Sequence, residues 1–110
     1  MTFKEQLIEK AEQSNIQKEM DYVKQEMEKY FSYREFHIRL YKARGNMVIG
    51  SSSGFGNNHA EFFIPNNITP NEYINLFIKA LEELGFTTKD IILDEKPGED
   101  YSLYSIKVRW

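Results

Sequence analysis

The most regular hydrophobic pattern in the chain lies between residues 69 and 85. Apolar side chains recur there at the spacing of one broad helix face. Thr69, Pro70 and Glu72 supply an N-cap, a first-turn proline and the third residue of a capping box. Gly85 suits the left-handed position that follows many helices. The pattern therefore predicts a helix over residues 70–84.

A second helical pattern, near the N-terminus, changes phase part of the way along. Thr2 and Glu5 fit a capping box, and apolar residues then mark one face as far as Ala11. The next apolar position, Ile16, comes five residues later, and a second capping-box sequence begins at Ser14. The region 3–31 is therefore either two helices or one long helix with a phase shift. We expect two segments, 3–13 and 15–31. We also expect their Met and aromatic stripe to pack on the domain's own sheet, the alternative being a seam between two chains.

Alternation of apolar and polar residues predicts the strands. In the strand predicted over 36–42, the even positions 36, 38 and 40 are apolar and the odd positions 37 and 39 are polar, while Tyr41 and Lys42 depart from the pattern. A turn at 44–46 leads to a return strand at 47–49, and a third strand covers 59–64. Two more strands are expected at 91–93 and at the C-terminal end, where Ser105, Lys107 and Arg109 share the polar face. The glycine- and serine-rich stretch 50–58 is interpreted as a flexible hairpin loop.

The order of the expected elements is α-β-β-β-α-β-β. Short connections, one apolar face per strand and two helical regions are typical of the α+β class. We predict a single domain, 1–110, built as a two-layer sandwich. Its mostly antiparallel sheet would have about five strands, with the helical regions 3–31 (broken near 14–15) and 70–84 on one face.

Composition narrows the function classes. The chain has 110 residues, 41% apolar and 15% aromatic, and no cysteine, which excludes disulfides and thiolate chemistry. It has no stretch of the ~20 apolar residues that a membrane span needs, and its polar start is unlike a signal peptide. We therefore expect a cytoplasmic protein that contacts no membrane. Richness in Ile, Asn, Lys and Tyr is typical of AT-rich genes, which points to a low-GC bacterium, its phage or another mobile element.

Charge gives a local indication. The net charge of −3 provides no overall attraction for nucleic acid. In the central segment 36–65, however, Arg39, Lys42 and Arg44 are opposed by Glu61 alone. Any surface that faces an anion should therefore involve this segment.

The two histidines give a weak indication of chemistry. If the first and third strands are neighbours, His37, His59 and Glu61 converge, and such a set can hold a metal ion or act as a base with its orienting group. No metal-binding or catalytic spacing accompanies them. We interpret the histidines as surface residues and expect no cofactor, no resident metal and no catalytic site, with an enzyme or metal site at these three residues as an alternative.

The polar face of the predicted sheet is the most informative feature. Aromatic residues among cations contact protein partners or stack on single-stranded nucleic acid. Our leading hypothesis is a small, non-enzymatic accessory or regulatory protein, monomeric or homodimeric, that binds a protein through this face and the 50–58 loop. The alternatives are nucleic-acid binding by the same face and a face that is merely solvated. The residues expected to contact the partner are Arg39, Tyr41, Phe55, Phe63, Lys107 and Arg109.

Overall fold

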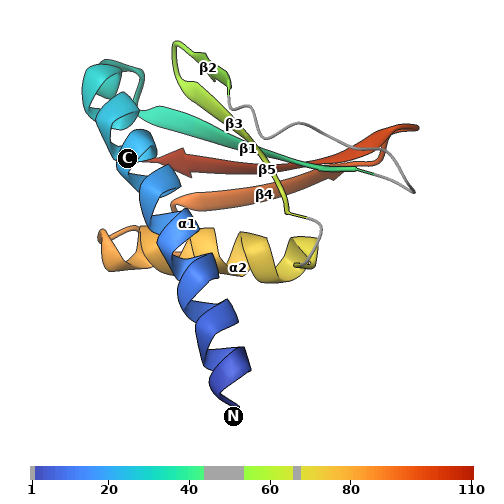
Figure 1. Ribbon diagram of the computed structural model, residues 1–110. Helices are drawn as coiled ribbons and strands as arrows, with labels where there is room; N and C mark the ends of the chain where they lie inside the picture. Colours follow the sequence, from blue (N-terminus) through green and yellow to red (C-terminus); the bar gives the residue numbers. More distant parts are fainter. Residues whose placement is uncertain (1, 44–53, 66–67) are drawn as a thin grey trace.

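The chain folds into two layers, a sheet and a pair of helices laid across it (Figure 1). The computed structural model describes residues 2–43, 54–65 and 68–110. In chain order the elements are α1 (Phe3–Lys29), a short 3-10 turn η1 (Phe31–Tyr33), β1 (Glu35–Ala43), β2 (Gly54–Gly56), β3 (His59–Phe63), α2 (Pro70–Glu83), β4 (Ile91–Lys96) and β5 (Tyr101–Arg109). The α+β class, with one sheet and two helices, is confirmed.

The sheet is mixed, with the strand order β2-β3-β1-β5-β4. β1 pairs with β3 in parallel, whereas the β2–β3, β1–β5 and β4–β5 pairs are antiparallel. The first and third strands, which run in the same direction, pair directly with each other because β2 lies outside β3 rather than between β3 and β1. Three of the four strand pairs are antiparallel, in line with the mostly antiparallel sheet expected, and the parallel β1–β3 pair makes the sheet mixed. Hydrophobic alternation shows where strands are, but it carries no information on the direction of their partners.

The second strand that the structure describes, β2, lies within the loop predicted at 50–58. The turn expected at 44–46, the strand expected at 47–49 and residues 50–53 of the expected loop all lie outside the described residues. Within the second half of that loop, Gly54–Gly56 forms β2 and pairs with β3 across a turn at Asn57 and Asn58. Two of its three residues are glycines, so β2 has no apolar alternation to reveal it in the sequence.

The core lies between the sheet and the two helices. The strands β1, β3 and β5 contribute their apolar faces, as the alternation predicted, and both helices contribute one stripe. This burial is the main source of stability. The buried residues are Ile16, Met20, Val23 and Met27 of α1, Tyr73, Phe77 and Leu81 of α2, Phe36, Ile38 and Leu40 of β1, Ala60 and Phe62 of β3, Ile106 and Val108 of β5, and Ile64 and Ile68 beside them.

α2 begins and ends as its sequence predicts. The Thr69 Oγ1 atom accepts a hydrogen bond from the Glu72 amide at 3.3 Å. At the other end Gly85 has a φ of 103°, a left-handed conformation that favours glycine. The Gly85 and Phe86 amides then donate to the carbonyls of Glu82 and Leu81, which is the Schellman arrangement. The helix itself ends at Glu83, one residue before the predicted end.

α1 is one continuous helix, so the expected break near Ser14 and Asn15 is wrong. Each of these residues costs about 0.5 kcal/mol relative to alanine inside a helix. That is less than the cost of ending the helix and leaving several carbonyls and amides unpaired. None of the helices described, α1 included, carries an apolar stretch of the length that a bilayer crossing requires.

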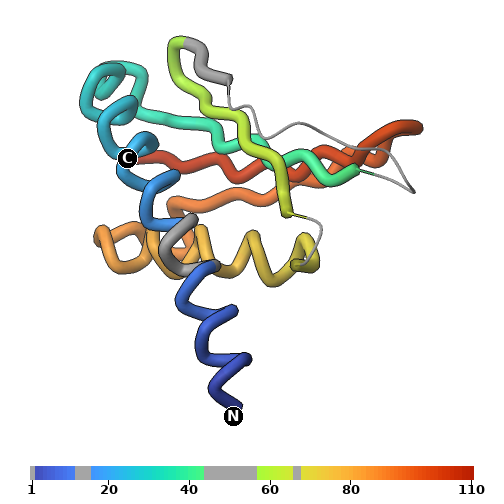
Figure 2. The backbone as a smooth tube through the Cα atoms, in the orientation of Figure 1, coloured from blue at the N-terminus to red at the C-terminus, as the bar shows by residue number. Residues whose placement is uncertain are grey.

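The phase shift in α1 has a structural meaning. Leu7 and Ile16 are nine residues apart, which at about 100° per residue places them on opposite sides of the helix. Ile16 is buried in the core, whereas Phe3, Leu7 and Ile8 are exposed. Figures 1 and 2 show that the first turns of α1 extend past α2, away from the sheet. The two apolar stripes therefore belong to two environments rather than to two helices.

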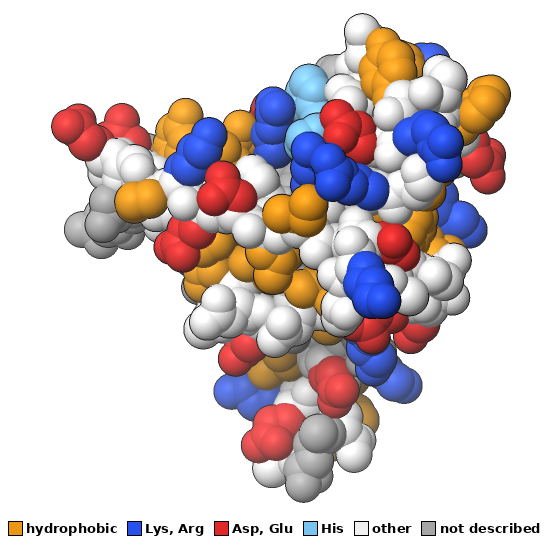
Figure 3. Space-filling model, turned by 180° about the vertical axis from the view of Figure 1, so that it is seen from behind, with side chains coloured by type: hydrophobic (Ala, Val, Ile, Leu, Met, Phe, Trp, Pro, Cys, Tyr) orange, Lys and Arg blue, Asp and Glu red, His pale blue; other side chains and the backbone are white. Residues whose placement is uncertain are grey.

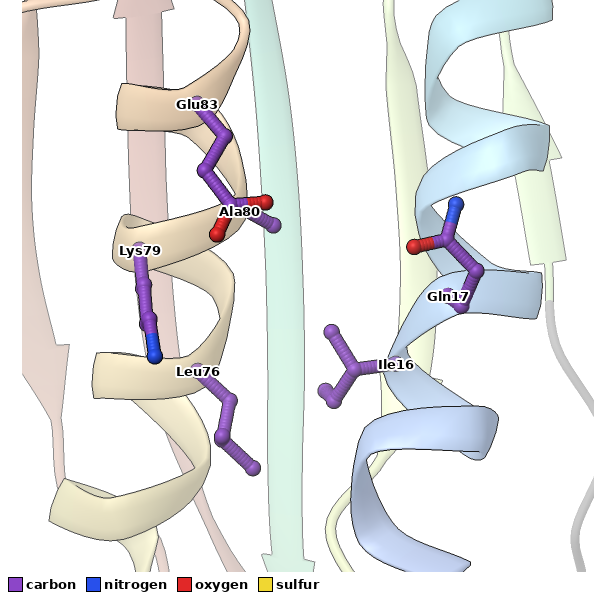
Figure 4. A pocket seen from close by; sticks show the side chains of 6 residues that line it. All are labelled: Ile16, Gln17, Leu76, Lys79, Ala80 and Glu83. Atoms are coloured by element: carbon purple, nitrogen blue, oxygen red, sulfur yellow. The ribbon is translucent and has the colours of Figure 1, made fainter. Parts of the chain in front are cut away.

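The helices leave a notch of about 200 Å³ where they cross (Figure 4). Ile16 and Leu76 extend into it from the two helices, and Gln17, Lys79 and Glu83 lie at its rim. The small side chain of Ala80 accounts for the space on the α2 side. We assign the notch to imperfect packing of the two helices.

A partly buried hydrogen bond joins the two helices. The Tyr73 hydroxyl donates to Glu19 Oε2 at 2.6 Å. Burial raises the pKa of Glu19 from 4.5 to about 7, and the bond from Tyr73 opposes part of this rise. The pKa of Tyr73 is also raised, chiefly by burial and then by the bond to Glu19. The neutral acid is therefore the form of Glu19 that suits this position.

Replacing Glu19 with glutamine should flatten the pH dependence of stability. Because the folded-state pKa of Glu19 is raised, its stabilising contribution is full below 4.5 and is lost as the pH rises through about 7. Glutamine keeps an acceptor for Tyr73 but does not ionise. Urea unfolding at several pH values between 5 and 8 should show the variant gaining stability over the wild type as the pH rises. His37, whose lowered pKa acts in the opposite direction, is common to both proteins, so parallel curves would contradict the assignment.

Candidate functional site

The side of the sheet turned away from the helices forms a continuous surface, which we call the open face (Figure 3). Strand alternation places on it the residues that lie between the buried ones. They form three rows across the sheet, each running from β3 through β1 and β5 to β4. The first row is Phe63, Tyr41, Leu103 and Lys96; the second is Glu61, Arg39, Ser105 and Asp94; the third is His59, His37, Lys107 and Ile92.

The first row begins an apolar corner of the open face. The Tyr41 ring lies 5.8 Å from the Phe63 ring and 5.2 Å from the Tyr101 ring, the latter edge-to-face. Leu103 stands directly opposite Tyr41 on β5. These four residues are the Tyr41 cluster. Burial and then the nearby Glu61 carboxylate raise the pKa of Tyr41, so its hydroxyl stays neutral at pH 7. The cluster is an aromatic patch with a polar edge, the composition that is enriched in protein interfaces.

Ion pairs occupy the remainder of the open face. Arg39 lies 3.5 Å from Glu61, and Lys107 lies 3.3 Å from Glu35. His37 and His59 approach the same two carboxylates at 3.7 and 3.9 Å. The pKa of Glu35 is lowered chiefly by its hydrogen bond with Lys107, whereas burial lowers the pKa of His37.

These pairs have a consequence for binding. Their side chains are 28–37% exposed, and pairs at such positions contribute only about 0–1 kcal/mol. A partner can therefore exchange its own charges for them at little cost.

A hollow of about 410 Å³ lies beside the Tyr41 cluster. Its lining is a three-by-three array taken from β1, β5 and β4, with Ser105 at the centre. Serine is smaller than all eight of its neighbours, so the surface dips at that point. We call this the Ser105 hollow. Its residues are His37, Arg39, Tyr41, Ile92, Asp94, Lys96, Leu103, Ser105 and Lys107.

The structure brings together four of the six predicted contact residues. Arg39, Tyr41 and Lys107 line the hollow, and Phe63 packs on Tyr41. Arg109 shares the open face but lies at the far end of β5, opposite Glu35. The backbone of Phe55 pairs with Ala60 on β2, and its side chain lies outside the described part of the structure.

One central cation has another role. The Lys42 ammonium donates hydrogen bonds to the carbonyls of Pro65 at 2.7 Å and Ile68 at 3.2 Å. Burial lowers its pKa. Lys42 thus holds the segment that precedes α2, and it does not contribute to the open face.

Several open-face residues were missed in the sequence. Continuing the alternation backwards from Lys107 and Ser105 would have placed Leu103 and Tyr101 on this face, so that signal was present. Asp94 and Lys96 belong to β4, which extends to Lys96 rather than ending at Leu93. Because Asp94 and Lys96 are polar, the apolar pattern does not indicate that the strand continues beyond Leu93.

The metal candidates are adjacent but not convergent. His37 and His59 are register partners on the paired strands β1 and β3, as the hypothesis required. Each imidazole, however, approaches a different carboxylate. Among the described residues no group of three or more histidine, aspartate or glutamate side chains is placed to hold a metal ion.

The chain was compared with known proteins in three ways. No protein-family model, curated protein or solved structure matches it.

Proposed function

We propose that this protein binds another protein through the open face, as a non-enzymatic accessory or regulatory factor. The observation that carries the proposal is the Tyr41 cluster beside the Ser105 hollow, on the side of the sheet that neither helix covers. Binding energy at protein interfaces concentrates in aromatic and arginine anchors next to pockets. Arg39 and Tyr41 are anchors of that kind, and polar pairs surround them as in an interface rim.

Single-stranded nucleic acid would use the same residue types but is less well supported. Its phosphates need cations that are free to neutralise them. Arg39 and Lys107 are already paired with Glu61 and Glu35, and Asp94 adds a further negative charge. Lys96 is the cation of the Ser105 hollow that the ion pairs of the described residues leave unused, which suits a single carboxylate better than a run of phosphates. A protein surface, which carries both signs, matches this arrangement better.

A capture experiment with matched variants tests the proposal. The variant Arg39→Ala/Tyr41→Ala/Phe63→Ala alters the open face, and Phe3→Ala/Lys18→Ala/Tyr22→Ala removes two aromatics and one cation from the exposed surface of α1. Each immobilised protein is exposed to lysate of the organism that encodes it. We expect a protein that the wild type and the α1 variant retain and the open-face variant loses. Equal retention by the open-face variant would refute the proposal.

With the purified partner, the Tyr41→Ala variant measures the strength of the anchor. Truncation of a central aromatic typically costs about 2 kcal/mol or more, which is roughly a 30-fold loss of affinity. Calorimetry with the wild type, Tyr41→Ala and Tyr22→Ala should show this loss for the first variant alone. A loss of less than about threefold, far below that range, would remove Tyr41 as an anchor.

A further inference from the structure

We infer that the Ser105 hollow receives an acidic side chain of the partner, from an extended segment whose apolar residue two positions away packs on the Tyr41 cluster. The inference rests on the function proposed above and names the chemistry that the open face recognises. Three features support it: the shape of the hollow, its charge, and its distance from the cluster.

The shape is that of a side-chain pocket. Ser105 forms the floor, and Arg39 and Asp94 stand on either side of it in the second row. The volume of about 410 Å³ falls within the ~300–1,000 Å³ range of ligand pockets. A side chain that enters from above meets the Ser105 hydroxyl and the long side chains of the walls.

The lining of the hollow carries three cations and one carboxylate, and two of these cations are also paired with Glu61 and Glu35, which lie outside the lining. Arg39, Lys96 and Lys107 line it against one carboxylate, that of Asp94. Burial lowers the pKa of His37, which favours its neutral form. The contact of Arg39 with Glu61 uses one of its five N–H donors, at the long distance of 3.5 Å. Lys96 is exposed, and the ion pairs found among the described residues do not include it. Donors therefore remain for an incoming carboxylate.

The distance between the hollow and the cluster sets the spacing in the partner. The hollow is centred on the second row and the cluster on the first, and neighbouring rows are two residues apart along each strand. Two residues of extended chain span roughly 6–7 Å and point to the same side. A segment that lies along the strands would thus place residues i and i+2 over the hollow and the cluster. The recognised element is an acidic residue with a Phe or Leu two positions from it.

Fluorescence anisotropy with labelled synthetic peptides tests this directly. Three extended peptides of equal length carry Glu-Ser-Phe, Lys-Ser-Phe or the adjacent pair Glu-Phe in an otherwise neutral sequence. We expect the Glu-Ser-Phe peptide to bind at least about tenfold more tightly than either of the others, since a tenfold ratio is the effect of one charge-assisted hydrogen bond. A labelled single-stranded oligonucleotide serves as a fourth probe.

Matched variants locate the contact. Lys96→Glu reverses a charge of the hollow, and Lys89→Glu makes the same change on an exposed residue outside it. We expect the first to weaken Glu-Ser-Phe binding about tenfold and the second to leave it within about twofold, since screening weakens distant surface charges. Ser105→Phe fills the hollow and should weaken Glu-Ser-Phe binding to the same extent as Lys96→Glu. An unfolding curve of this variant verifies that it folds.

Each other result overturns the inference. If Lys-Ser-Phe bound as tightly as Glu-Ser-Phe, the hollow would not recognise negative charge. If Glu-Phe bound as tightly, the two-residue spacing would not be recognised. An oligonucleotide that binds more tightly than the peptide and depends on Lys96 would identify phosphate as the ligand. The absence of peptide binding up to about 1 mM would exclude the motif. In all of these cases the capture experiment still decides the proposed function independently.

Discussion

Replacing Phe77 with alanine is expected to lower the free energy of unfolding by about 3–5 kcal/mol, out of a typical total of 5–15 kcal/mol. Phe77 is fully buried, and the centre of its ring lies 5.8 Å from that of Phe62 and 5.5 Å from that of Tyr73, the latter edge-to-face. Removing its ring leaves a cavity where α2 meets the sheet. Alanine is the best helix former, so the loss would report packing rather than helix propensity. Urea denaturation at pH 7 measures it.

Phe3→Ala is the matched control for this experiment. Phe3 is also a phenylalanine within a helix, but it is 74% exposed at the start of α1. Its truncation should change stability by no more than about 0.5 kcal/mol. Similar losses for both variants would mean that α2 does not form the main helical cover of the sheet.

Replacing Ile106 with aspartate is expected to leave the chain largely unfolded at pH 7. Ile106 is fully buried on β5, with Ile38 of β1 on one side and Leu93 of β4 on the other. A carboxylate there has no cation to pair with, and its desolvation costs several kcal/mol, comparable with the whole stability of a small domain. Far-UV circular dichroism and the dispersion of amide resonances would detect the loss.

The adjacent residue provides a sharp control. Ser105 precedes Ile106 on the same strand but belongs to the open face, so Ser105→Asp places the same carboxylate next to Arg39 and water. It should fold with a stability within about 1 kcal/mol of the wild type. If Ser105→Asp unfolded the protein as Ile106→Asp does, Ser105 would not lie on the open face, and the proposed site would be wrong.

The elements that were predicted well have strong local signals. α2 carries its own start and stop chemistry in Thr69 and Gly85, and those hydrogen bonds form within the helix ends themselves. β1 alternates because one of its faces is buried. Such signals depend on residues near one another in the chain, so a single sequence contains them.

The elements that were predicted poorly depend on the rest of the molecule. The break expected in α1 came from assuming that all of its apolar residues face one surface. Leu7 and Ile16 instead face different surroundings, which the periodicity alone does not distinguish. Likewise, β2 is a strand because β3 offers it an edge, and its Gly-Phe-Gly sequence contains no sign of this.

The candidate site was predicted in part for the same reason. Arg39, Tyr41 and Lys107 follow from alternation on two strands. The hollow follows from the register that puts Ser105 between Arg39 and Asp94, and register is set by pairing across the sheet. Ser105 forms a hollow only because the residues around it are larger. Those residues come from three separate segments of the chain, so the sequence next to Ser105 does not reveal the hollow.

The position of β5 between β1 and β4 in the sheet bears on how the chain folds. Its register joins Glu35 to Arg109 and Ala43 to Tyr101, so every pair links residues more than half the chain's length apart. High contact order of this kind slows folding toward the millisecond-to-second range. During synthesis, at roughly 5–20 residues per second, the apolar face of β1 waits several seconds for its neighbour. Chaperones that recognise extended apolar segments would meet the nascent chain in that interval.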